Sequence, residues 1–197
     1  LQLPGTTYAP GPGLLLRPSV REPFAALKDA AAALGHNYLQ KDPGGVARAM
    51  YPFIESRGVA VPSLGLAGVL LAGQVPAEAV RLEGRQFRAG SVTVPLRDNG
   101  EVLLKLHGPY ARDGRSTFPI HPFFDVLLSE EQVSNGEAPN IQESAFAGKI
   151  VFVGTTATGL ADVHETAFAG STPGAYLHAT LADNLLQGIG RIIRGVD

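Results

Sequence analysis

The sequence predicts an α/β fold, in which a mixed sheet carries helices packed on it and an antiparallel hairpin excursion covers residues 79–106. Three observations support this class. The short apolar run at 150–153 is rich in β-branched residues, as in a strand that is buried on both faces. A polar loop and an amphipathic helical pattern at 174–187 follow it, which is the order of a strand–loop–helix unit. Segments of weak alternation between turn signals fill the excursion and are typical of hairpins.

The composition is that of a folded protein, and we expect a single domain over residues 1–197. Of the 197 residues, 45% are hydrophobic and only 17% are charged, which excludes a disordered chain. The net charge is −2 without blocks of like charge, so nucleic acid is not an expected partner. No cysteine is present, which excludes disulfides, thiolate metal sites and a cysteine nucleophile. The apolar stretch at 59–73 is shorter than the roughly 20 residues that a membrane-spanning helix needs.

The N-terminal part is predicted to be extended and then helical. Residues 1–21 contain Pro-Gly clusters and an apolar run, so we expect an extended lead-in with one strand. A helix is predicted at 22–34, because Pro23 suits a first helical turn and Gly35 is a stop signal.

A hairpin and a buried helix are predicted next. Strands at 36–40 and 46–55 flank a turn at 42–45, and Pro52 marks an edge position or a bulge in the second strand. The helix predicted at 62–71 is apolar almost all round, which indicates burial on every side.

Two successive hairpins are expected within the excursion. The first turns at Gly84, and the second turns at Asp98-Asn99-Gly100 before an apolar strand at 102–106. A short helix is then predicted at 121–128. Ser129 opens a polar loop that runs to about residue 140, and a helical turn is predicted at 141–146.

The last helix, at 174–187, has a regular apolar face. Leu177, Leu181 and Leu185 recur every four residues and Leu186 widens the stripe, which predicts packing on the sheet. Asn184 and the aspartate before it are expected to face solvent.

The loop from Gly154 to Gly159 has the glycine spacing of a phosphate-binding loop. That motif continues with Lys and Ser or Thr, whereas Leu160 and Ala161 stand at these positions, so nucleotide binding is not expected. Two interpretations stay open. The loop makes a sharp turn in which its threonines bond the local backbone, or it contacts a small ligand.

Polar residues in and after this loop are the candidate ligand-binding residues: Thr155, Thr156, Thr158, Asp162, His164 and His178. A carboxylate and two imidazoles are ligands that zinc accepts, but the spacing lacks the i, i+4 pairing of helical zinc motifs, so we assign no metal site. No G-x-S-x-G elbow and no carboxylate pair placed for acid–base work occur, so no catalytic residue is assigned and no cofactor is expected.

Several motifs follow one another in an order that is characteristic of a known family. They are Leu34-Gly35-His36, Asp42-Pro43 with Gly45-Val46-Ala47-Arg48, Pro62-Ser63-Leu64, Phe118-Pro119 with Phe124-Asp125-Val126-Leu127, the run Gly148 to Ala157 with Asp162, Pro173-Gly174 with His178-Ala179, and Asp183 to Gly188. Together they resemble the second class of CHASE domain, the cyclase/histidine-kinase-associated sensory extracellular domain. The resemblance covers most of residues 20–190.

The resemblance implies the extracytoplasmic sensory domain of a membrane-bound receptor, such as a histidine kinase, a nucleotide cyclase or a diguanylate cyclase. It implies that the domain itself is not an enzyme and has no cofactor. The expected partners are an unknown small-molecule ligand or a protein, together with a second copy in a homodimer of the full receptor, and membrane attachment is expected through segments outside this chain. The chain is expected to correspond to the C-terminal two-thirds of the family domain.

The expected mechanism is non-catalytic signal reception. A ligand, a partner or a change of dimer packing would alter the loop 155–164 and bias the helix 174–187 between two arrangements. One alternative is a small hydrolase or metal-dependent enzyme that uses Asp162, His164 and His178. Another is a dimerisation module without a ligand.

Overall fold

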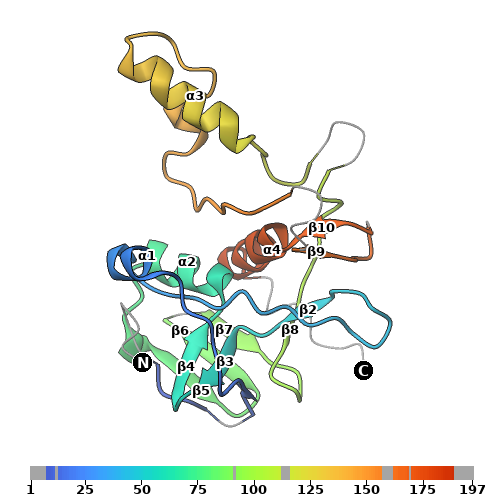
Figure 1. Cartoon of the computed structure of the whole chain (residues 1–197). Coiled ribbons are helices and arrows are strands. Elements are labelled where there is room, and N and C mark those ends of the chain that lie inside the picture. Colours follow the sequence, from blue (N-terminus) through green and yellow to red (C-terminus); the bar gives the residue numbers. More distant parts are fainter. Residues whose placement is uncertain are drawn as a thin grey trace.

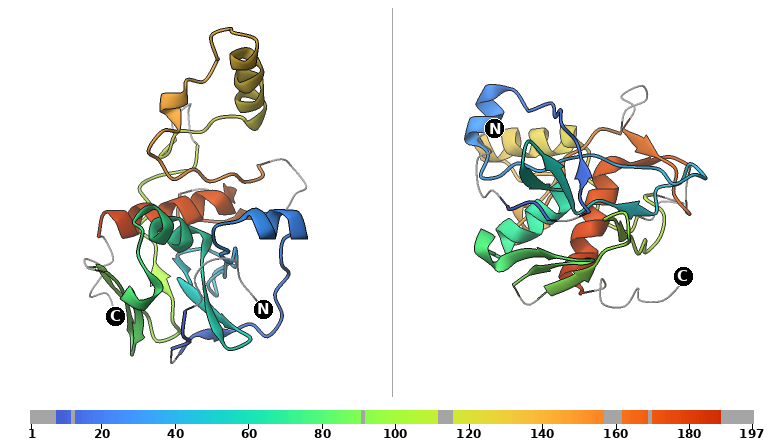
Figure 2. Two further views of the ribbon diagram at one scale, coloured as in Figure 1. Left: turned by 90° about the vertical axis from the view of Figure 1, so that its left-hand side faces the viewer. Right: turned by 90° about the horizontal axis from the view of Figure 1, so that it is seen from below.

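The computed structural model describes residues 8–11, 13–90, 92–111, 116–156, 162–168 and 170–188 (Figure 1). Two helices, α2 and α4, lie side by side, with most of the small sheets on one side of them and α3 projecting from the other side (Figures 1 and 2). The helices are α1 Ala25–Ala30, α2 Leu64–Ala72, α3 Phe123–Ser134 and α4 Gly174–Leu186, with 3₁₀ turns η1 Ala77–Ala79 and η2 Glu143–Ala145.

The strands form four small sheets. Their bounds are β1 Leu15–Leu16, β2 Ala49–Met50, β3 Phe53–Ser56, β4 Val59–Pro62, β5 Val80–Glu83, β6 Gln86–Ala89, β7 Val92–Pro95, β8 Val102–Leu103, β9 Val163–His164 and β10 Thr172–Pro173. The sheet β1-β3-β4 is mixed, because β1 runs parallel to β3 and β4 runs antiparallel to it. The sheet β5-β6-β7 and the pairs β2-β8 and β9-β10 are antiparallel. The predicted α/β class, with a mixed sheet and antiparallel hairpins, is confirmed.

The core lies between the helix pair and the sheets. Leu66 of α2 and Leu177 and Leu181 of α4 are fully buried and share one cluster with Phe53 and Phe87 of the strands. The rings of these two phenylalanines meet edge to face with centroids 5.6 Å apart, a geometry that aromatic pairs favour.

The two core helices approach closely because α2 lacks a side chain at the contact. A Cβ atom on Gly65 would lie 2.5 Å from the carbonyl oxygen of His178, so no larger residue fits without movement. Ser63 caps α2, since its side chain accepts a hydrogen bond from the backbone N–H of Leu66. The helix predicted at 62–71 is confirmed over Leu64–Ala72, but it is not buried on every side, since Leu64 and Leu71 are 41% and 50% exposed.

The helix predicted at 22–34 is confirmed only over Ala25–Ala30, and it buries nothing. Phe24 and Leu27 are 72% and 52% exposed, and the chain becomes extended at Ala31. The extended lead-in with one strand is borne out by β1, although residues 1–7 lie outside the described part.

The hairpin predicted between 36–40 and 46–55 is wrong. The turn itself forms, with the Gly45 N–H donating to the carbonyl of Asp42 at 2.8 Å, but the flanking segments pair elsewhere. Pro52 separates β2 from β3, since it lacks the N–H that a continuous strand would need. β2 then pairs with β8, and β3 pairs with β4, a strand that the sequence analysis did not predict.

The excursion contains the first predicted hairpin but not the second. β5, β6 and β7 pair in order, whereas β8 pairs with β2 and not with β7.

The helix predicted at 121–128 continues to Ser134, because Glu130 and the residues after it are good helix formers. Ser129 does not open a loop, because it is a residue of α3. Its hydroxyl donates to the carbonyl of Asp125, one turn earlier in the helix, at 2.7 Å. The helical turn predicted at 141–146 is confirmed by η2.

The doubly buried strand predicted at 150–153 is also wrong. This segment pairs with no strand of the described chain. Ile150 and Phe152 are half-buried and face Gly68 of α2, whereas Val151 and Val153 are 52% and 78% exposed. Side chains alternate across an extended backbone, and only one of the two faces is covered here.

The helix predicted at 174–187 is confirmed, with two corrections to its faces. Leu186 is 64% exposed and does not belong to the apolar stripe. Asn184 is buried rather than solvent-facing, because its amide bonds both backbone groups of Lys105: Lys105 N–H donates to Oδ1 at 2.8 Å, and Nδ2 donates to the Lys105 carbonyl at 3.1 Å.

Candidate functional site

The loop predicted to contact a ligand begins and ends on the first turn of α4. At its start, a Cβ added to Gly154 would collide with the side chain of Ala175. At its end, the backbone N–H of Gly174 donates to the carbonyl of Asp162 at 3.0 Å. A Cβ on Gly174 would lie 2.5 Å from a carboxylate oxygen of Asp162, so a larger residue there would displace this carboxylate. Both ends of the loop thus depend on the position of α4.

The threonines of the loop are not part of a described cluster. Thr155 and Thr156 are exposed, and no hydrogen bond of their side chains occurs within the described residues. Thr158 lies outside the described residues. Their ligand-binding role stays a prediction.

Asp162, His164 and His178 lie near one another at the start of α4. Asp162 bonds His164, with 3.3 Å between Oδ1 and Nε2. The carboxylate of Asp162 also lies at the N-terminus of α4, where the helix dipole favours negative charge. His178 lies one turn further along α4. The Asp162 carboxylate raises the pKa of His178, and His164 lowers it.

His178 is a buried, neutral ring that joins the two core helices. It is 2% exposed, and its Nδ1 accepts the backbone N–H of Gly65 at 3.4 Å. An acceptor at Nδ1 leaves the proton on Nε2. Burial lowers the pKa of His178 from 6.5 to about 4, while the Asp162 carboxylate acts in the opposite direction.

His36 completes this group, and sequence reasoning missed it. It is 9% exposed, its Nδ1 accepts the backbone N–H of Tyr38 at 3.2 Å, and its backbone pairs with the start of α2 through Pro62 and Leu64. Burial, with a smaller contribution from His178, lowers the pKa of His36 from 6.5 to about 3. The only sequence signal was its place in the motif Leu34-Gly35-His36, which says nothing about a second histidine far along the chain.

We call His36, Asp162, His164 and His178 the histidine cluster. Three of its ring nitrogens, one in each histidine, make no hydrogen bond of normal geometry. Within the described residues, no three His, Asp or Glu side chains are arranged to hold a metal ion. The cluster instead connects the loop, α4 and α2, and the rings of His36 and His178 within it are buried and neutral.

The family model for the CHASE2 domain matches residues 7–196. The chain belongs to the CHASE2 domain family. This family consists of sensory extracellular domains of receptors, and a sensor domain is itself non-catalytic. Neither the curated proteins nor the solved structures contain a match.

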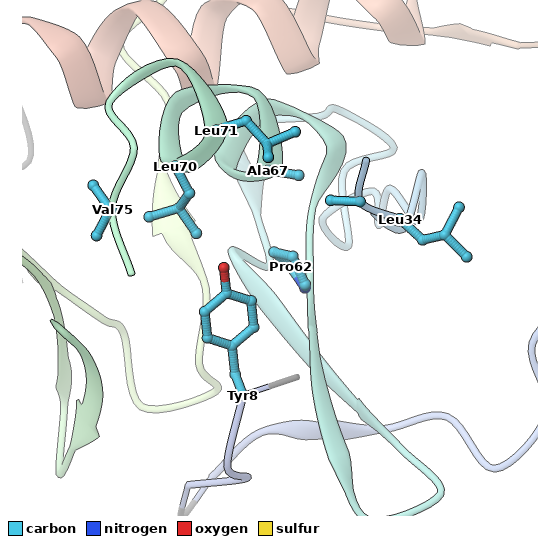
Figure 3. A pocket seen from close by; sticks show the side chains of 8 residues that line it. Tyr8, Leu34, Pro62, Ala67, Leu70, Leu71 and Val75 are labelled. Atoms are coloured by element: carbon cyan, nitrogen blue, oxygen red, sulfur yellow. The ribbon is translucent and has the colours of Figure 1, made fainter. Parts of the chain in front are cut away.

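This CHASE2 domain also has a small apolar cavity beside α2. Tyr8 points its hydroxyl end toward Leu70, with Pro62 and Val75 on either side (Figure 3). The cavity holds about 30 Å³, which is the space of about one water molecule. It is a packing gap and not a site for a metabolite. Across the described part of the CHASE2 domain, no helix combines the length and the apolar character that crossing a membrane requires.

Proposed function

We propose that this CHASE2 domain is the extracytoplasmic signal-input domain of a membrane-bound receptor whose output is a histidine kinase, a nucleotide cyclase or a diguanylate cyclase. One observation supports it most: the loop that carries the candidate ligand residues is seated at both ends on the first turn of α4. A change in the loop therefore acts directly on the last helix of the described chain.

The mechanism follows from the contacts of Asp162. In the described arrangement, its carboxylate faces the N-terminus of α4 and His164. A ligand or a partner that binds at Thr155, Thr156 or His164 competes for this carboxylate and weakens its hold on α4. A difference of about 1–3 kcal/mol between the two arrangements changes their populations about 5- to 150-fold, which is sufficient for signalling.

The proposal includes the partners of the full receptor. The stimulus is a small molecule or a protein, the receptor is a homodimer, and segments outside these 197 residues attach it to the membrane. No observation on the described residues favours the alternative, a small hydrolase or metal-dependent enzyme that uses Asp162, His164 and His178.

The experiment compares variants of the full receptor. Asp162→Asn keeps the shape of the side chain but removes its charge, so we expect basal output, or the midpoint of the response to the inducing condition, to change by at least about fivefold. Asp98→Asn is the matched control, because Asp98 is an exposed residue whose side chain pairs with Arg85. If Asp162→Asn and the double variant of Thr155 and Thr156 to valine both give wild-type output, the loop is not the input site.

A further inference from the structure

A charged cleft lies apart from the histidine cluster, where the turn at 42–45 meets the turn at 97–100. Its volume is about 410 Å³, within the size range of small-molecule sites. Its lining includes Lys41, Asp42, Arg48, Arg97, Asn99 and Glu101. We call it the Glu101 cleft.

The cleft is held by the short ladder between β2 and β8. Arg48 directly precedes β2, and Glu101 directly precedes β8. The ladder pairs Met50 with Val102 and Ala49 with Leu103, and the Leu104 N–H donates to the Arg48 carbonyl at 2.9 Å. The pairing of β2 with β8 thus fixes the positions of Arg48 and Glu101, on the two walls of the cleft, relative to one another.

Glu101 is a buried carboxylate without a charged partner. It is 8% exposed, yet no lysine, arginine or histidine of the described chain forms an ion pair with it. Its one side-chain partner is the neutral amide of Asn99, which donates to Oε2 at 2.7 Å. Glutamate is almost never buried unless it is paired, so this carboxylate calls for a cationic group from outside the chain.

The other charges of the cleft divide into a pair and two free cations. Arg48 forms an ion pair with Asp42, whose carboxylate also accepts the Val46 N–H at 2.9 Å. Lys41 and Arg97 are exposed, and neither has an ion-pair partner in the described chain. After the Arg48–Asp42 pair is set aside, the cleft offers two positive groups and one negative group.

From these charges we infer that the Glu101 cleft binds a free acidic amino acid, such as glutamate. The ammonium group pairs with Glu101, and the two carboxylates pair with Lys41 and Arg97, so the ligand with a net charge of −1 neutralises the cleft. A neutral amino acid leaves one cation unpaired, and a dicarboxylate without an amine leaves Glu101 unpaired.

The experiment is isothermal titration calorimetry of the 197-residue chain with L-glutamate. We expect a dissociation constant below about 1 mM, which corresponds to about −4 kcal/mol. Glutarate has the same two carboxylates but no ammonium group, and it is expected to bind at least about tenfold more weakly. The inference is wrong if glutamate does not bind at millimolar concentration, or if glutarate binds equally well.

Variants locate the binding. Glu101→Gln keeps an acceptor for Asn99 and removes the charge, and it is expected to weaken glutamate binding at least about tenfold. Arg97→Gln is expected to do the same. Arg97 is exposed, so this substitution is expected to leave folding unchanged, and the inference is testable even if Glu101→Gln fails to fold. Glu130→Gln, on the exposed side of α3, is the control and is expected to bind as the unsubstituted chain does. Unchanged affinity in Arg97→Gln, or in a folded Glu101→Gln, places the ligand elsewhere and overturns the assignment. The measurement does not depend on the proposed receptor function, because absence of binding leaves the contacts between the loop and α4 as they are.

Discussion

Mild acid should destabilise this CHASE2 domain, because folding keeps two histidines neutral. The pKa of His36 is lowered to about 3 and that of His178 to about 4, mainly by burial, whereas both take up protons near pH 6.5 in the unfolded chain. Below about pH 6.5 the unfolded state therefore binds more protons than the folded state. The free energy of unfolding is therefore highest above about pH 6.5, and it falls as the pH drops toward the pKa values that His36 and His178 have in the folded state.

The size of the effect follows from linkage. Well below pH 6.5, each such histidine costs about 1.4 kcal/mol of unfolding free energy for each unit of pH. Between about pH 7 and about pH 5.5 the two histidines together lower the free energy of unfolding by about 2.5 kcal/mol. Urea denaturation, followed by circular dichroism at a series of pH values, measures this loss.

Substitution by asparagine assigns the loss to single residues. Asparagine retains an acceptor near the position of Nδ1, so His178→Asn still receives the Gly65 N–H but can no longer titrate. We expect the pH-dependent loss to fall by about half in this variant and to remain in His121→Asn, which removes an exposed ring. A free energy of unfolding that is constant from about pH 7 to about pH 5.5, or an unchanged slope in His178→Asn, refutes the reasoning.

Three further substitutions, two of them with a control substitution, test the packing of α4 by urea denaturation. Leu181→Ala should cost about 2–5 kcal/mol of stability because the side chain is fully buried, whereas Leu186→Ala on the exposed face should change it by less than about 0.5 kcal/mol; equal effects would contradict the assigned faces. Gly65→Ala should cost about 1–3 kcal/mol, because its Cβ would meet a backbone carbonyl of α4, while Gly170→Ala, with open space around it, should be neutral. Asn184→Asp should cost about 1–3 kcal/mol, since a carboxylate cannot donate to the carbonyl that the amide now bonds, and wild-type stability in this variant would show that the bond contributes nothing.

The helices were the part of the fold that local patterns predict best. Leu177, Leu181 and Leu185 were correctly placed in the core, since a stripe at helical spacing needs only one apolar surface to pack against. Asn184 was placed wrongly, because polarity normally indicates solvent and its partner is a backbone segment 79 residues away. The prediction of strand pairing failed because it also depends on segments far apart in the sequence. β2 prefers β8 over its neighbours in sequence, and nothing in the composition of either strand specifies that choice.

The candidate site was predicted in part. Sequence proximity sufficed to join Asp162 with His164, and the helix after them brought His178 into reach. His36 was not predicted, because it comes from a segment more than 120 residues earlier that pairs with the start of α2. The prediction of a doubly buried strand at 150–153 was wrong because β-branched residues indicate only an extended backbone. They do not show whether a neighbouring strand pairs with it.

Because Gly65 lacks a side chain, the backbones of α2 and α4 meet at His178, and in the proposed mechanism α4 turns about this contact. A push at the first turn would then rotate α4 about His178, whose ring also accepts the Gly65 N–H. From residue 178 to residue 186 the arm is about 12 Å long, and a rotation of about 5° therefore moves its far end by about 1 Å. The two hydrogen bonds of Asn184 lie on this arm and hold it in its resting position. In the proposed mechanism, displacement of the Asp162 carboxylate at the first turn of α4 would thus become a larger movement at the other end of the helix.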